Sequence, residues 1–83
     1  MKLSTTTARL LVQNAEALKA TGRLESPLGG AWDREALLRS VDKADSLDLS
    51  RRAGRPLLTV HNARTGANQV YVSSPKALEL LTA

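Results

Sequence analysis

Two stretches near the C-terminus have the composition of β-strands and are joined by a short connection. Residues 57–62 (LLTVHN) and residues 69–73 (QVYVS) are rich in β-formers, and in the second stretch apolar and polar side chains alternate. Gly66 in the connection favours the positive φ that a tight turn needs. We therefore predict a β-hairpin over residues 57–73. Because a two-stranded hairpin is marginally stable in water, it must pack against helices or pair with a strand of another chain.

Two helices are predicted before the hairpin. Apolar side chains recur at helical spacing over residues 5–21, and Gly22 follows where a C-terminal cap is expected. Asp33 can cap a second helix over residues 33–45. Between the two helices, residues 22–31 contain three Gly and one Pro, which predicts a loop.

A short helix is predicted after the hairpin, over residues 75–82, because Pro75 suits the first position of a helix. Residues 46–50 (SLDLS) fit a further helical turn and an extended stretch equally well. The predicted fold class is α+β, with two N-terminal helices, a β-hairpin and a short C-terminal helix. The length of 83 residues fits a single small domain, residues 1–83.

The composition argues against several kinds of site. Without Cys the chain has neither a disulfide nor a thiolate metal ligand, and its one His, His61, is too few for a zinc site built from imidazoles. We expect no metal and no cofactor. No apolar stretch forms a signal peptide or approaches the ~18 residues of a membrane span. The expected location is the cytoplasm, with no membrane partner.

No group of residues has the spacing of a catalytic site. His61 lacks a nucleophile elbow or a local triad pattern around it. Asp42, Asp45 and Asp48 are three residues apart, which is more typical of a solvated polar face than of an acid/base pair or a metal site. We therefore expect a protein that is not an enzyme.

Basic residues are concentrated in the last third of the chain. The net charge is +4, and residues 51–64 hold four Arg and no acidic residue. Such a block favours an anionic partner, either nucleic acid or an acidic protein face, although a solvated basic face is the alternative. One of only two aromatic residues, Trp32, either packs between the helices or serves as a binding anchor. The candidate partner-binding residues are Arg51, Arg52, Arg55, Arg64 and Trp32.

The block contains a string that resembles a DNA-binding motif. Residues 51–56 (RRAGRP) resemble the core of an AT-hook, in which Arg lies along the minor groove. Ala53 stands where that motif has Arg, and Leu57 and Leu58 follow where it has further basic residues. The interpretation that we favour is a turn that leads into the hairpin.

A second resemblance covers residues 55–81. The string RPLLTV, a Gly-containing turn, VYVSS and a Leu-bearing helix resemble the hairpin of Phd/YefM-type antitoxins, which are small DNA-binding proteins that neutralise a toxin. The two segments before residue 55 differ from the short strand-helix start of that family. The resemblance implies a hairpin followed by a helix, and DNA as a possible partner.

Two classes of function remain. The first is an inhibitor or adaptor that docks on a protein or nucleoprotein complex, of the kind that phages and other mobile elements use against host defence or regulatory machinery. The alternative is a small DNA-binding transcriptional regulator or an antitoxin-like protein. The first is favoured because the basic block lacks a helix-turn-helix or other groove-reading motif. A homodimer is also expected, because a second copy could cover unpaired hairpin edges.

Overall fold

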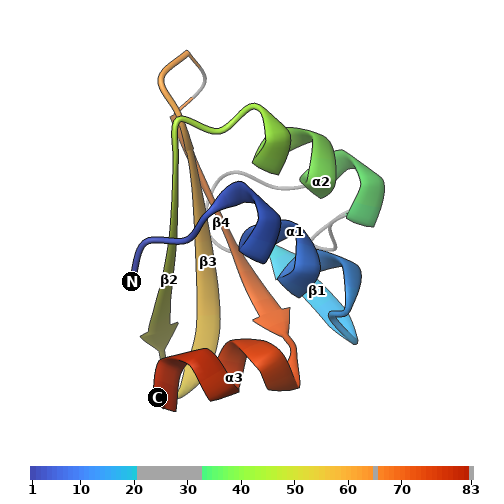
Figure 1. Ribbon diagram of the computed structural model, residues 1–83, viewed down its shortest axis with the longest axis vertical. Coiled ribbons are helices and arrows are strands. Elements are labelled where there is room, and N and C mark those ends of the chain that lie inside the picture. The colour runs from blue at the N-terminus through green and yellow to red at the C-terminus, as the bar shows by residue number, and fades with distance from the viewer. Residues whose placement is uncertain (21–32, 65, 83) are drawn as a thin grey trace.

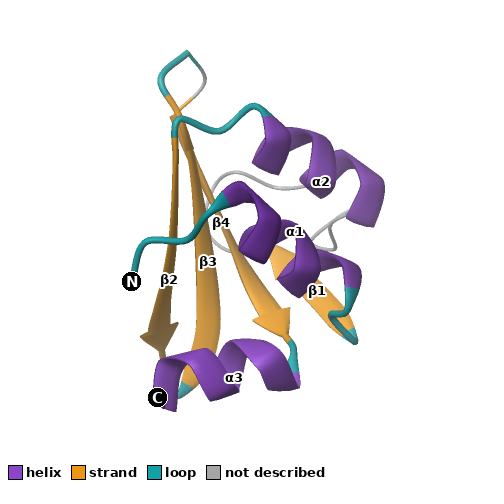
Figure 2. Cartoon of the chain, viewed as in Figure 1, coloured by secondary structure: helices purple, strands orange, loops and turns teal. Residues whose placement is uncertain are grey.

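A four-stranded antiparallel sheet carries three helices on one face in the computed structural model, which describes residues 1–20, 33–64 and 66–82 (Figure 1). The strand order is β1-β4-β3-β2. The elements in chain order are α1 (Thr5–Gln13), β1 (Ala17–Ala20), α2 (Arg34–Asp42), β2 (Ser46–Arg52), β3 (Arg55–Asn62), β4 (Gly66–Ser73) and α3 (Pro75–Thr82). The α+β class is confirmed, whereas the predicted arrangement is only partly matched (Figure 2).

The first predicted helix, residues 5–21, is too long. α1 ends at Gln13, and the Asn14 side chain donates a 2.9 Å hydrogen bond to the Leu10 carbonyl at this end. The chain then enters β1, which pairs with β4. Leu18, one of the apolar residues at helical spacing within residues 5–21, is buried, but it reaches the core from a strand. A few apolar positions fit both periodicities, so burial alone did not reveal the element type.

The second helix also ends earlier than predicted, and the ambiguous stretch after it is extended. α2 begins after Asp33, whose carboxylate accepts a 3.3 Å hydrogen bond from the Glu35 N–H, as its capping role predicts. It ends at Asp42. Residues 46–50 lie in β2, where Leu47 and Leu49 point into the core.

The predicted hairpin corresponds to β3 and β4, and each of its outer edges is paired within the chain. β2 pairs with β3, and β1 pairs with β4. The hairpin edges on which the homodimer expectation rested are therefore occupied, and β1 and β2 are the outermost strands of the sheet. The homodimer stays a prediction. The predicted loop over residues 22–31 lies outside the described residues.

The core lies between the sheet and the helices and is made of aliphatic side chains. All three helices and all four strands contribute to it. Its largest fully buried side chains are Leu11, Leu37, Leu49, Leu58, Val12, Val41, Val60, Val70 and Val72. Since none of them carries a polar atom, the core is held together by burial and close packing alone.

α1 and α2 are joined by two Arg side chains. Arg34, at the start of α2, donates hydrogen bonds to the carbonyls of Val12, Gln13 and Ala15 at the end of α1, over 2.6, 2.9 and 2.8 Å. Nη1 of Arg9 in α1 donates to both carboxylate oxygens of Asp42 at the end of α2, over 2.8 and 2.7 Å. These contacts fix the end of α1 and hence the start of β1.

Candidate binding surface

The turn between β2 and β3 gathers three of the candidate Arg residues. Arg51 and Arg52 end β2, and Arg55 begins β3. In the strand register Arg52 lies directly opposite Arg55. All three residues are exposed. We call Arg51, Arg52 and Arg55 the basic tip.

A two-residue turn with positive φ at both positions makes the basic tip. Ala53 has φ 54° and Gly54 has φ 75°. Two positive φ values in a two-residue hairpin loop characterise the type I′ turn, which matches the twist of the flanking strands. Glycine adopts this conformation freely, whereas alanine is strained in it by roughly 1–2 kcal/mol. The string that resembles an AT-hook thus forms a tight hairpin turn.

Replacing Ala53 with asparagine should stabilise the protein. The change creates Asn-Gly, the pair that type I′ turns prefer, and should raise the free energy of unfolding by about 0.5–1 kcal/mol. Urea unfolding followed by circular dichroism measures the change. Gly54→Ala, at the second positive φ, should lower stability by a similar amount. Loss of stability in Ala53→Asn would show that the turn is not strained at this position.

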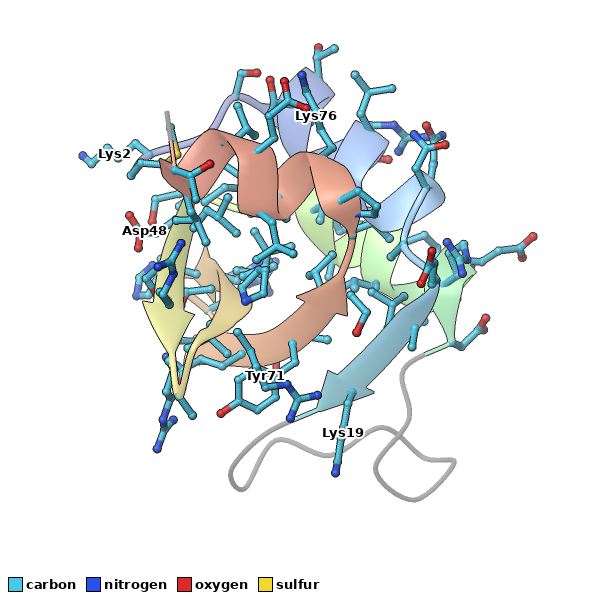
Figure 3. All side chains as sticks on the ribbon, turned by 90° about the horizontal axis from the view of Figure 1, so that it is seen from below. Lys2, Lys19, Asp48, Tyr71 and Lys76 are labelled. Atoms are coloured by element: carbon cyan, nitrogen blue, oxygen red, sulfur yellow. The ribbon has the colours of Figure 1, made fainter. Side chains whose placement is uncertain are left out.

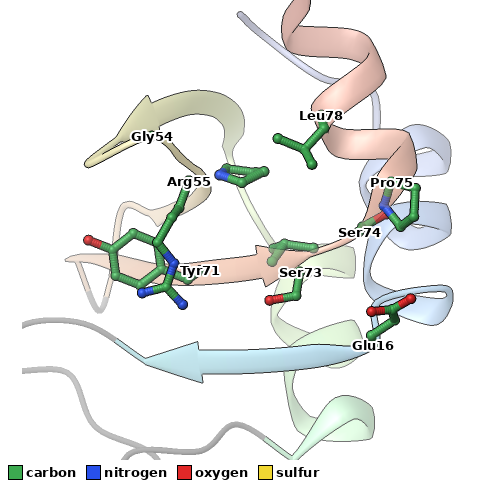
Figure 4. A pocket seen from close by; sticks show the side chains of 10 residues that line it. Glu16, Gly54, Arg55, Tyr71, Ser73, Ser74, Pro75 and Leu78 are labelled. Atoms are coloured by element: carbon green, nitrogen blue, oxygen red, sulfur yellow. The ribbon is translucent and has the colours of Figure 1, made fainter.

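The basic tip has an unfavourable charge arrangement. Like charges directly opposite each other on neighbouring strands destabilise a sheet, and Arg52 and Arg55 are such a pair. Within the described residues, none of the ion pairs includes a residue of the basic tip. The Arg55 guanidinium lies over the Tyr71 ring, 4.5 Å from its centroid (Figure 4). This stacking contact holds the Arg55 side chain but gives its charge no acidic partner among the residues that the structure describes.

Lys19 and Tyr71 extend this surface across the sheet. Tyr71 of β4 pairs in register with Lys19 of β1 on one side and with Leu57 of β3 on the other. Figure 3 shows Tyr71 and Lys19 on the side of the sheet that faces away from α3. Neither residue was predicted for the site. Lys19 could have been placed beside Tyr71 from the sequence only by predicting residues 17–20 as a strand that pairs with residues 70–73.

The structure places Arg64 away from the basic tip. Arg64 lies in the turn between β3 and β4, at the opposite end of the strands, where its N–H donates a 2.9 Å hydrogen bond to the Asn62 side chain. Trp32 lies outside the described residues.

The described residues offer little for a catalytic or metal site. His61 is exposed on β3, where it pairs in register with Ser46 and Ala67. In the described part of the chain, no cluster of three His, Asp or Glu side chains could hold a metal ion. The helices of that same part include none that is long and apolar enough to span a membrane.

The chain matches no protein-family model, no curated protein and no solved structure. The resemblance of residues 55–81 to the Phd/YefM hairpin therefore rests on the hairpin pattern alone.

Proposed function

We propose that this protein is a non-enzymatic inhibitor or adaptor that docks through its basic tip on an acidic surface of a protein or nucleoprotein complex. The observation that supports this function is the set of three exposed Arg residues at a strained turn, without an acidic partner in the described residues. An arrangement that costs stability is typical of a functional site, because binding can repay the cost.

A small DNA-binding regulator is the second candidate. A two-stranded β-ribbon fits the major groove, and the β2–β3 hairpin would place Arg side chains against phosphates. The helices do not support this candidate as a helix-turn-helix, because β1 separates α1 from α2 along the chain. A helix-turn-helix needs two helices joined by a turn of about 3–4 residues.

The double substitution Arg52→Glu and Arg55→Glu should weaken partner binding at least about tenfold. It replaces two positive charges with two negative ones, and folding should change little because exposed substitutions usually shift stability by less than about 0.5 kcal/mol. Tagged protein is used to capture partners from a lysate of the encoding organism, with and without nuclease, and the capture is repeated with the variant. A protein retained after nuclease treatment and lost in the variant is the expected result.

Arg39→Glu with Arg64→Glu is the charge-matched control. Both residues are exposed, on α2 and in the β3–β4 turn. This control should bind as the parent protein does. Equal binding by both double variants would refute docking through the basic tip. Tight binding of plain duplex DNA, with affinity falling steeply as salt rises, would instead establish the regulator.

A further inference from the structure

Beside the basic tip, a hollow of about 270 Å³ lies between α3 and the neighbouring strand ends (Figure 4). Apolar groups dominate its lining, including Pro56, Val72, Pro75 and Leu78. Arg55 and Tyr71 form its edge on the side of the basic tip. An apolar hollow of this size can take one anchoring side chain of a macromolecule.

Leu78 is the exposed leucine of α3 at this hollow. Its side chain is 44% exposed, while Ala77 is buried and Leu80 and Leu81 pack against the core. Figure 4 shows Leu78 pointing from α3 into the hollow. A single exposed leucine is normal on a protein surface, whereas Leu78 is continuous with the apolar lining of the hollow.

A second apolar hollow adjoins the first. It shares Glu16, Ser74 and Pro75 with the first hollow, and Leu10 of α1 lies at its other side. Leu10 is 49% exposed. Together with Met1, Leu10 and Leu78 are the exposed large hydrophobic residues of the described chain. We call the two hollows together the α3 groove.

The charges around the α3 groove are positive at the end that meets the basic tip. Arg55 borders the first hollow, and Glu16 lines both hollows. Lys76 borders the second hollow, where its ammonium lies 3.9 Å from the Glu79 carboxylate. Arg51 and Arg52 lie next to Arg55 at the basic tip. A complementary ligand therefore combines apolar side chains with acidic neighbours. The phosphates of a nucleic acid would match the charges but would leave Leu10 and Leu78 in water.

We infer that the α3 groove binds an acidic amphipathic peptide segment of the partner, with an apolar side chain in the hollow beside Leu78 and carboxylates against Arg55 and the neighbouring Arg side chains of the basic tip. This inference rests on the proposed function and names the chemistry of the partner. The apolar anchor supplies the contact area, and the basic residues select acidic segments over basic ones.

The test uses a fluorescein-labelled 15-residue peptide with Leu at every third or fourth position and Asp or Glu at most others. Fluorescence anisotropy should show saturable binding to the full chain. Two matched peptides serve as controls: one replaces each Leu with Ser at the same charge, and one replaces each acid with Lys. Both should bind at least tenfold more weakly. Equal binding by the Ser peptide, or no binding of the probe up to 1 mM protein, would overturn the inference.

Variants of the protein locate the peptide in the groove. Leu78→Ser and Leu10→Ser should each weaken binding of the acidic peptide at least fivefold while circular dichroism shows that the protein stays folded at the assay temperature. Glu16→Gln should strengthen binding of the peptide about twofold. If both Leu variants bind the peptide as the parent does, the groove is not its site. If they also capture the natural partner as well as the parent does, while the Arg52 and Arg55 reversal does not, the proposed function stands and this inference fails.

Discussion

Replacing Leu58 with alanine should lower the free energy of unfolding by about 3–5 kcal/mol. Leu58 lies in β3, an inner strand of the sheet, and its side chain is fully buried in the core. Removing a buried leucine loses its transfer free energy and leaves a cavity, which together cost about 2–5 kcal/mol. A position on an inner strand, surrounded on all sides, should fall in the upper half of that range. Urea unfolding monitored by circular dichroism measures the effect.

Leu78→Ala is the matched control for this substitution. It removes the same atoms from a side chain that is 44% exposed, and it should cost less than about 1 kcal/mol. A chain of 83 residues has a total stability of roughly 4–12 kcal/mol, so Leu58→Ala could leave the protein largely unfolded at 37 °C. Similar costs for the two substitutions would mean that the core does not lie between the helices and the sheet.

Replacing Arg34 with alanine should lower the free energy of unfolding by about 2–3 kcal/mol. The guanidinium donates to three carbonyls at the C-terminal end of α1, where the helix dipole favours a positive charge. A hydrogen bond that involves a charged group contributes about 1.5–3 kcal/mol, and the three bonds share one side chain, so their contributions do not add fully. Thermal and urea unfolding of the variant measure the loss.

Arg34→Lys separates the charge from the geometry. Lysine keeps the positive charge near the end of α1 but lacks the planar fork that reaches several acceptors at once. It should recover less than half of the loss seen in Arg34→Ala. Full recovery would show that the dipole interaction, and not the set of three hydrogen bonds, provides the stability.

Local patterns in the sequence were enough to predict α3 and the hairpin of β3 and β4. Pro75 marks the start of α3, and the alternation around Tyr71 marks β4. β1 was missed because its four residues follow α1 after a short turn and continue the apolar spacing of that helix. The contact of Arg34 with α1 also could not be predicted, because it joins residues far apart in the sequence.

The candidate site was predicted in part for similar reasons. The Arg residues of the basic tip are close in sequence, so their clustering follows from the string RRAGR. The sequence placed Arg64 at the tip of the predicted hairpin, and the structure has it there, in the β3–β4 turn, at the other end of β3 from the basic tip. Lys19 and Leu10 come from the first 20 residues, and only the pairing of β1 with β4 brings that segment to this end of the molecule.

The strand order has a consequence for how the protein folds. β2, β3 and β4 are consecutive in the chain and pair as neighbours, so they can form by local hairpin closure. β1 pairs with β4, from which it is far apart in the sequence, and such distant contacts form slowly. The order of assembly favours β1 as the last strand to join and the first to separate in partial opening of the native state. Leu10 lies in α1 and Glu16 directly precedes β1, and both line the α3 groove. A ligand in the α3 groove would therefore oppose the separation of β1 from β4 and protect the amides of β1 from hydrogen exchange.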